Sequence, residues 1–212
     1  MTQKRDHGGG IDAAIAQYGG TRESWLDLST GINPTPYPMP DLPHDAWTAL
    51  PDQAAFTRLY DLARRFWNVP EGAAIIGATG ASAIIAALPR VIPTGDVCIP
   101  APTYNEHAAA FAASGWRLGQ DARHATVAVH PNNPDGHLWQ AADLATPYVI
   151  IDESFCDVTP KASLIHLAQR PGTVVLKSFG KFWGLAGLRL GFAIGDPAIV
   201  GKLTDLLGPW QV

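Results

Sequence analysis

The sequence carries little charge and almost no cysteine. Of its 212 residues only 16% are charged, and 15 basic residues against 19 acidic ones leave a net charge of −4. This weak, acidic balance argues against nucleic acid or another polyanion as a partner. Two cysteines, Cys98 and Cys156, are too few for a disulfide scaffold and fit a reduced cytoplasmic protein. The spacing of histidine and cysteine matches no zinc motif, so we predict no metal site.

Signals for a membrane or for secretion are also lacking. Residues 1–10 are polar and contain no apolar stretch of the kind found in a signal peptide. Residues 72–89 carry no charge, but they are rich in alanine and glycine, so a buried strand, a turn and a buried helix explain them better than a membrane span. With 47% hydrophobic residues the chain is not disordered and can form one sizeable core.

Glycine and proline are plentiful, with 21 and 18 residues, which indicates many turns between short elements. Prolines crowd residues 1–50, so we predict an irregular N-terminal arm over residues 1–45 and a single large domain over residues 46–212. From residue 52 onward, apolar residues recur at helical spacing until Val69-Pro70 ends the pattern.

Strands and helices then alternate along the chain, which predicts an α/β domain with a largely parallel sheet. Ligands of such sheets bind beyond the carboxyl ends of the strands, and polar clusters follow these strands. The predicted strands cover residues 74–76, 96–99, 126–130, 148–151, 173–177 and 191–194, and the predicted helices cover residues 81–88, 104–113 and 139–144.

Lys181 is the strongest candidate for chemistry. A lysine amine becomes a nucleophile toward carbonyl groups when it is partly desolvated, and Lys181 has aromatic and apolar neighbours. Alone, it is read more simply as a surface lysine on an aromatic loop. A hydroxyl three residues earlier, Ser178, and a guanidinium eight residues later, Arg189, could together bind a phosphate group.

The stretch from Ser178 to Gly191, SFGKFWGLAGLRLG, resembles the cofactor-lysine motif of fold-type I pyridoxal-phosphate enzymes, near histidinol-phosphate aminotransferase. The resemblance implies a mixed, mostly parallel seven-stranded sheet flanked by helices. It also implies that Lys181 bonds pyridoxal 5'-phosphate as a Schiff base and that Ser178 and Arg189 bind the cofactor phosphate. Asp152 then pairs with the pyridine nitrogen, although an aspartate at this place can also be an ordinary helix N-cap.

Other positions follow in the order of that family. Asn133 resembles the asparagine that contacts the phenolic oxygen of the cofactor, and Tyr104 resembles the aromatic residue stacked on its ring. An Asn-Pro turn and a core aromatic are the simpler alternatives. The segment Gly80-Ala81-Ser82 opens a helix, where backbone N–H groups bind phosphate. Neither a Walker motif nor a G-x-G-x-x-G after the first strand is present, so dinucleotide binding has little support.

The N-terminal region resembles the threonine-phosphate decarboxylase branch of cobalamin synthesis, through His7-Gly8-Gly9 and the stretch Leu26 to Pro34, LDLSTGINP. The resemblance implies that Gly31, Ile32 and Asn33 border the substrate carboxylate and that His7 and Gly8 lie near the substrate phosphate. The implied reaction is decarboxylation of L-threonine O-3-phosphate to (R)-1-amino-2-propanol phosphate. A homodimer is implied as well.

Two positions depart from the aminotransferase pattern, since Leu50 and Phe155 stand where aminotransferases carry tyrosine. The C-terminal small domain of the family, with its carboxylate-binding arginine, is not found here, so we expect a truncated chain with doubtful turnover. An aminotransferase of the histidinol-phosphate type and a non-catalytic fragment that binds cofactor or another polypeptide remain alternatives.

Overall fold

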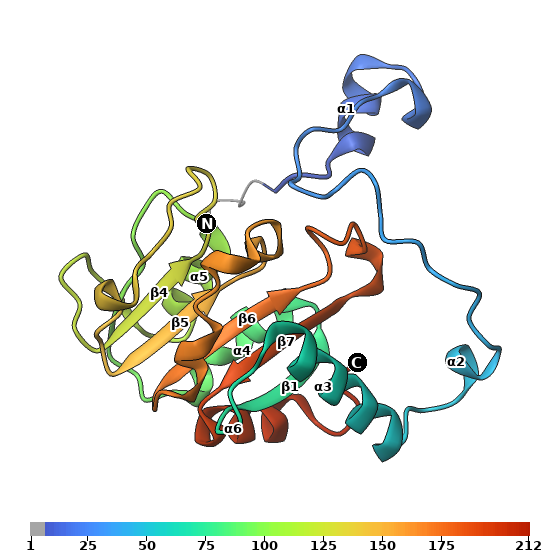
Figure 1. The fold of residues 1–212 in the computed structure, drawn as a ribbon. Coiled ribbons are helices and arrows are strands. Elements are labelled where there is room, and N and C mark those ends of the chain that lie inside the picture. Colours follow the sequence, from blue (N-terminus) through green and yellow to red (C-terminus); the bar gives the residue numbers. More distant parts are fainter. Residues whose placement is uncertain (1–6) are drawn as a thin grey trace.

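The computed structural model describes residues 7–212, so the first six residues of the predicted arm lie outside the described part. A seven-stranded sheet forms the centre, in the order β1-β7-β6-β5-β4-β2-β3 (Figure 1). Only β7 runs antiparallel, to both of its neighbours, which confirms the expected mixed, mostly parallel sheet. The strands are β1 (Ala74–Thr79), β2 (Asp96–Cys98), β3 (Arg117–Leu118), β4 (Ala125–Val129), β5 (Tyr148–Asp152), β6 (Thr173–Ser178) and β7 (Leu190–Gly195).

Both faces of the sheet are covered, which is why the central strands are nearly continuous apolar runs. One buried cluster joins one face to α4 (Ala81–Val91), α5 (Asn105–Ala113) and α6 (Pro197–Leu207). A second cluster joins the other face to α3 (Gln53–Trp67) and to short 3-10 turns such as that at Ile165–Gln169. The uncharged residues 72–89 are therefore β1, its turn and most of α4, as expected. Among the described residues no helix has both the length and the apolar character needed to cross a membrane.

Capping residues set the bounds of α3. The Asp52 carboxylate accepts a hydrogen bond from the backbone N–H of Ala55 at 2.7 Å, which caps the first turn. At the other end Asn68 adopts a left-handed conformation, with φ of 53°, and the helix stops there. Between these caps the apolar stripe of the helix buries Ala63 and Trp67 against the sheet.

Three expectations about local structure were wrong or incomplete. The arm is not wholly irregular, because it contains α1 (Ile11–Tyr18), and the short α2 (Asp45–Thr48) begins at its last residue. The helix predicted over residues 139–144 is only a 3-10 turn at Ala141–Asp143, since Trp139 bonds both His130 and the carbonyl of Val129 and so holds the chain extended. Helix α6, begun by Asp196 and Pro197, and the two-residue strand β3 had not been expected.

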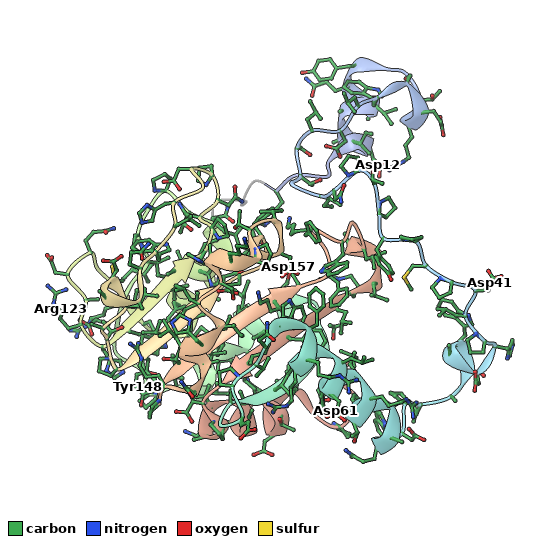
Figure 2. The ribbon with its side chains drawn as sticks, in the orientation of Figure 1. Asp12, Asp41, Asp61, Arg123, Tyr148 and Asp157 are labelled. Carbon is green, nitrogen blue, oxygen red and sulfur yellow. The ribbon has the colours of Figure 1, made fainter. Side chains whose placement is uncertain are left out.

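The arm leaves the body of the domain and returns to it at α3 (Figure 1). Most of its side chains are exposed, as Figure 2 shows for the outlying residues Asp12 and Asp41. It nevertheless contacts the domain, since residues 33–37 lie along the loop that follows β6 and His7 Nε2 lies 3.0 Å from Oε1 of Glu106 in α5.

Candidate active site

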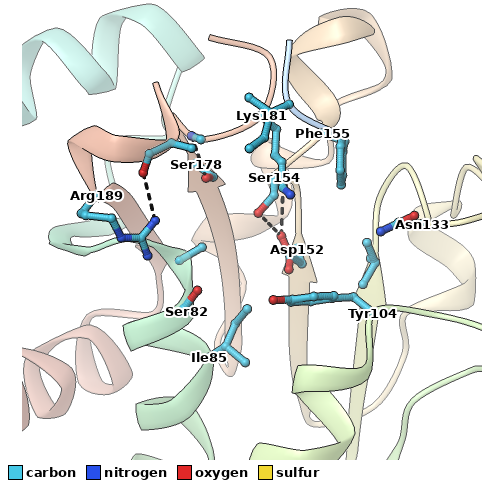
Figure 3. A pocket seen from close by; sticks show the side chains of 15 residues that line it. Ser82, Ile85, Tyr104, Asn133, Asp152, Ser154, Phe155, Ser178, Lys181 and Arg189 are labelled. Atoms are coloured by element: carbon cyan, nitrogen blue, oxygen red, sulfur yellow. Dashed lines mark hydrogen bonds between the residues drawn. The ribbon is translucent and has the colours of Figure 1, made fainter. Parts of the chain in front are cut away.

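A cavity of about 230 Å³ opens at the carboxyl ends of β5 and β6, beside the start of α4 (Figure 3). This is the edge at which parallel sheets bind ligands. It brings together most of the predicted cofactor residues, although they are spread over more than a hundred positions of the chain. The predicted residues that line it are Ile32, Ala81, Ser82, Tyr104, Asn133, Asp152, Ser178, Lys181 and Arg189, together with Phe155.

Asp152 ends β5 and is almost completely buried, with 3% exposure. Its Oδ2 lies 2.8 Å from Nε2 of His107, and its Oδ1 accepts hydrogen bonds from the N–H and Oγ of Ser154 at 3.0 and 2.6 Å. Burial alone raises the pKa of this carboxyl, but the contact with His107 and the two donors of Ser154 outweigh burial and lower its pKa below the usual range. The structure therefore holds a buried carboxylate in its charged form.

His107 was not among the predicted residues, although it is 1% exposed and contacts Asp152 directly. It lies in the first turn of α5, three residues after Tyr104, the residue that precedes the helix. Their rings meet edge to face, with centroids 6.1 Å apart. This spacing is the signal in the sequence that could have revealed His107.

Lys181 lies in the loop after β6, and its amine points toward Asp152 (Figure 3). Partial burial lowers the pKa of this amine, while the charge of Asp152 acts in the opposite direction. Its Nζ lies 5.3 Å from the centroid of the Phe155 ring, within cation–π range. A partly desolvated amine of this kind is suited to nucleophilic attack on a carbonyl group.

The opposite side of the cavity is built to receive an anion. Arg189, with a left-handed φ of 53°, lays its guanidinium against Gly80 so closely that a Cβ there would lie 2.4 Å from Nη2. A Cβ on Gly191 would likewise lie 2.4 Å from the backbone N of Ala81. No side chain of the described residues caps the first turn of α4, so a guanidinium and a helix N-terminus face one space that leaves no room for a Cβ at Gly80 or Gly191.

Hydroxyl groups complete this anion site. Ser178 Oγ accepts a hydrogen bond from the N–H of Gly180 at 3.1 Å, which leaves its proton available to a ligand. Ser82, in the first turn of α4, also lines the cavity. With a buried carboxylate in the middle, an amine above it and an anion site at one side, the donor set fits pyridoxal 5'-phosphate.

Asn133 lies on the far side of Asp152 from Arg189 (Figure 3). The preceding residue, Asn132, has a structural role, because its amide bonds the carbonyl of Pro102 and the carboxylate of Asp135. Asn132 also accepts a hydrogen bond from Thr103 at 2.6 Å. Of two consecutive asparagines, therefore, the first fixes the loop and the second reaches the cavity.

The predicted substrate residues separate into two groups. A second, more open cavity of about 440 Å³ adjoins the first and is lined by His7, Gly8 and Gly31, while Ile32 lines the first cavity. The two cavities share Tyr104, Asn133 and Lys181. Ser29, Thr30, Thr103 and Asn105 also line the second cavity and had not been predicted.

Asn33, also expected beside the substrate carboxylate, contacts the loop that carries Lys181. Its Nδ2 donates a hydrogen bond to the carbonyl of Phe182 at 2.8 Å, and its Oδ1 accepts one from the N–H of Thr35 at 3.0 Å. Its backbone N–H bonds the carbonyl of Lys181 at 3.0 Å. The side chain is thus engaged in holding the lysine loop.

A buried cluster below the site, His130, Glu153 and Cys156, brings metal-type side chains close together. Both nitrogens of His130 are engaged, since Nδ1 accepts from the backbone N–H of Trp139 and Nε2 therefore donates to the carbonyl of Ala162. Burial raises the pKa of Cys156 to about 12, so its thiol stays protonated. This cluster offers neither a free imidazole nor a thiolate.

Comparison with known proteins bears on the family to which this chain belongs. A family model described as aminotransferase class I and II matches residues 119–212. The threonine-phosphate decarboxylase of Pseudomonas aeruginosa is 38% identical over 98% of this chain and 67% of its own length. Among solved structures, the histidinol-phosphate aminotransferase of Clostridium acetobutylicum has a TM-score of 0.72 at 21% identity, covering 89% of this chain and 66% of that one. The L-threonine-O-3-phosphate decarboxylase of Porphyromonas gingivalis has a TM-score of 0.68 at 20% identity, with 79% and 60% covered.

The fold is that of aminotransferases of class I and II, and the 38% identity to threonine-phosphate decarboxylases along nearly the whole chain makes the protein a pyridoxal-phosphate-dependent enzyme. Within that class the chain belongs to the family of threonine-phosphate decarboxylases, which are lyases. It spans about two thirds of the length of the curated relatives that it matches.

Proposed function

We propose that the protein decarboxylates L-threonine O-3-phosphate to (R)-1-amino-2-propanol phosphate in cobalamin synthesis. The observation that carries this proposal is the pairing of two adjoining cavities. The first combines a charged, buried Asp152 with the Lys181 amine and an anion site, and the second is polar and lined by residues of the arm. The likeness to decarboxylases along nearly the whole chain supports the same reaction.

In this proposal the cofactor, when bound, supplies an electron sink for the bond that breaks at Cα of the substrate. Asp152 would favour the protonated form of the pyridine nitrogen, because its own charge is stabilised by His107 and Ser154. Arg189, Ser178 and the first turn of α4 would hold the cofactor phosphate.

Lys181 has two tasks in the same proposal. Its amine would hold the aldehyde of the cofactor and, once the substrate amine has displaced it, Nζ would be free to carry a proton to Cα. The residues of the second cavity would orient the substrate and so select which bond at Cα breaks. We assign His7 and Gly8, with the hydroxyls of Ser29 and Thr30, to the substrate phosphate, and Gly31 and Ile32 to the side of its carboxylate.

Incubation with pyridoxal phosphate, borohydride reduction and peptide mass spectrometry test the assignment of Lys181. We expect the pyridoxyl label on Lys181 and none there in Lys181→Ala, while the exposed Lys161 and Lys202 serve as internal controls. Label spread over several lysines would contradict the assignment.

Product analysis with L-threonine O-3-phosphate separates the decarboxylase from an aminotransferase of the histidinol-phosphate type. A decarboxylase releases carbon dioxide and keeps the amino group, whereas an aminotransferase forms a keto acid. We expect the first result. Phe155 supports it, because phenylalanine in the cavity cannot donate the hydrogen bond that the tyrosine of the aminotransferase pattern supplies.

We also propose a homodimer. The arm and the adjoining α2 carry large apolar side chains that are 75% or more exposed, namely Leu26, Leu28 and Trp47, and such surface favours association. Size-exclusion chromatography with light scattering across a dilution series tests this proposal. A monomer at all concentrations would overturn it.

A further inference from the structure

A buried carboxylate, Asp157, lies in the 3-10 turn Cys156–Val158 and takes no part in the chemistry proposed above. Its side chain is 8% exposed. Oδ2 accepts a hydrogen bond from the indole N–H of Trp183 at 2.9 Å, and Oδ1 accepts one from the indole N–H of Trp67 at 3.0 Å. Lys177 Nζ lies 3.5 Å from Oδ1. A buried charge is tolerated only when it is paired and hydrogen-bonded, and Asp157 meets this condition on both oxygens.

The bonded partners of Asp157 lie on either side of Lys181 in the sequence. Lys177 stands in β6, four residues before Lys181, and Trp183 stands in the loop, two residues after it. Lys177 is further fixed by Glu153, whose Oε2 lies 2.6 Å from its Nζ. One carboxylate thus ties the strand before Lys181 to the loop after it.

Asp157 also belongs to the segment that carries Asp152. It lies in the 3-10 turn Cys156–Val158, which begins four residues after the end of β5, and the N–H of Cys156 bonds the carbonyl of Glu153, the residue after the strand, at 3.0 Å. The carboxylate in the centre of the cavity and the carboxylate that holds the lysine loop are therefore five residues apart on one short, buried piece of chain.

The lysine loop needs such an attachment, because much of it is exposed. Phe182, Leu188 and Arg189 are exposed to solvent. The ring of Trp183, in contrast, packs between those of Phe179 and Phe66, with ring centroids 5.5 and 5.4 Å away. The indole N–H is the polar end of this packed ring, and it points to Asp157. Packing against the neighbouring aromatic rings fixes the position of the Trp183 indole, and the hydrogen bond to Asp157 fixes its orientation.

We propose that Asp157, acting through Trp183, is a positioning residue that sets where the Lys181 amine stands relative to Asp152. The inference rests on the proposed function, because it takes Lys181 as the lysine that bonds the cofactor. Trp67 supplies a matched control, since it donates to the same carboxylate from α3 and lies outside the lysine loop.

The test compares Trp183→Phe with Trp67→Phe in the full chain. The readouts are the rate at which pyridoxal phosphate becomes reducible onto Lys181, the absorption maximum of the bound cofactor, and the free energy of unfolding in urea. Loss of one hydrogen bond of ordinary strength corresponds to roughly a fivefold change. We expect labelling of Lys181 to slow about fivefold in Trp183→Phe, with a shifted absorption maximum. In Trp67→Phe only the stability should fall.

A role in stability alone would affect the two variants alike. Equal labelling rates in Trp183→Phe and Trp67→Phe, or a rate in Trp183→Phe within a factor of about two of wild type, would overturn the inference. If Trp183→Phe does not fold, β-(3-benzothienyl)alanine at position 183, with the same replacement at position 67 as control, keeps the bicyclic ring and removes only the N–H. Failure of the wild-type protein to label at Lys181 would overturn the proposed function and the inference together, whereas wild-type labelling with equal variants overturns the inference alone.

Discussion

Two regions meet at Lys181, the carboxyl edge of the sheet on one side and the N-terminal arm on the other, and they hold their residues differently. At the sheet edge, Asp152 is fixed by buried side chains, with His107 at 2.8 Å and Ser154 at 2.6 Å. On the arm side the contacts involve mainly the backbone: the N–H of Asn33 bonds the carbonyl of Lys181 at 3.0 Å, and that of Tyr37 bonds the carbonyl of Trp183 at 2.8 Å.

This difference separates the control of charge from the control of shape. A carboxylate keeps a lowered pKa in a buried place only when donors surround it, so the sheet edge sets protonation. Contacts between backbone groups carry little charge and depend on how closely two segments of the chain approach each other. The arm therefore sets the shape of the cavity beside Lys181. Substitutions at the sheet edge should therefore lower the free energy of unfolding of the whole domain, and substitutions in the arm should change only the local structure.

The largest effect is expected for Asp152→Ala. Removing the carboxylate leaves the buried His107 ring and the Ser154 donors without their acceptor, which should lower the free energy of unfolding by about 3 kcal/mol. Urea unfolding followed by circular dichroism measures this loss. Ser154→Ala, which removes one donor and leaves the His107 contact, should lose only about 1 kcal/mol.

The same carboxylate predicts a pH dependence. Because its folded-state pKa lies below the ordinary value of 3.8, its contribution to stability is present above pH 3.8 and is lost as the pH falls through the folded-state pKa. In Asp152→Asn this part of the acid dependence should vanish. A variant that retained the full acid dependence would contradict the assignment.

Gly184→Ala tests the fit between the arm and the lysine loop. Gly184 has a φ of 67°, and a Cβ there would lie 2.7 Å from Cα of Pro36 and 2.8 Å from the carbonyl oxygen of Asn33. We expect a loss of about 2 kcal/mol and faster proteolytic cleavage within the arm. Gly187→Ala is the matched control, since a Cβ at this glycine of the same loop has no atom within 4 Å. Equal cleavage rates in the two variants would disprove the contact.

Asn33→Ala should have a smaller effect. It removes the hydrogen bond to the carbonyl of Phe182 and leaves the backbone bond to Lys181 in place, so about 1 kcal/mol is expected. Amide hydrogen exchange of residues 181–184 should become faster, while the buried strand β6 stays protected. Thr48→Ala removes the hydrogen bond from the Thr48 hydroxyl to the carbonyl of His44 at α2. It should leave hydrogen exchange in residues 181–184 unchanged.

The smallest effect is expected in the pH dependence of labelling at Lys181. Partial burial lowers the pKa of this amine below 10.5, and the negative charge of Asp152 works against that shift. The pH midpoint of labelling should therefore lie below 10.5, and Asp152→Asn should move it lower still. A midpoint that rises in this variant would contradict the proposed electrostatic interaction between Asp152 and the Lys181 amine.

The sequence predicted the sheet-edge half of the site much better than the arm half. Ser178, Lys181 and Arg189 lie in one motif, and Asp152 follows an apolar run that could only be a buried strand. Contacts of this kind are local, or they follow from the rule that strand ends share an edge.

The arm contacts could not be predicted, because they join residues far apart in the chain. Asn33 and Phe182 are 149 positions apart, and nothing in the pattern around Asn33 distinguishes a residue that binds substrate from one that holds a loop. The failed helix at residues 139–144 has a similar cause, since the contacts of Trp139 with β4 and His130 outweigh local helix propensity.

The reversed direction of β7 has a consequence for how this chain can vary. Ser178 pairs with Gly191 and Thr79 pairs with Leu190, so the hairpin between β6 and β7 starts and ends at the cavity. That hairpin supplies both the amine of Lys181 and the guanidinium of Arg189, and its contour length sets their spacing. The number of residues between positions 181 and 189 therefore has to stay constant if the amine and the guanidinium are to reach the same ligand. Insertions and deletions should be tolerated in the arm but not between these two residues.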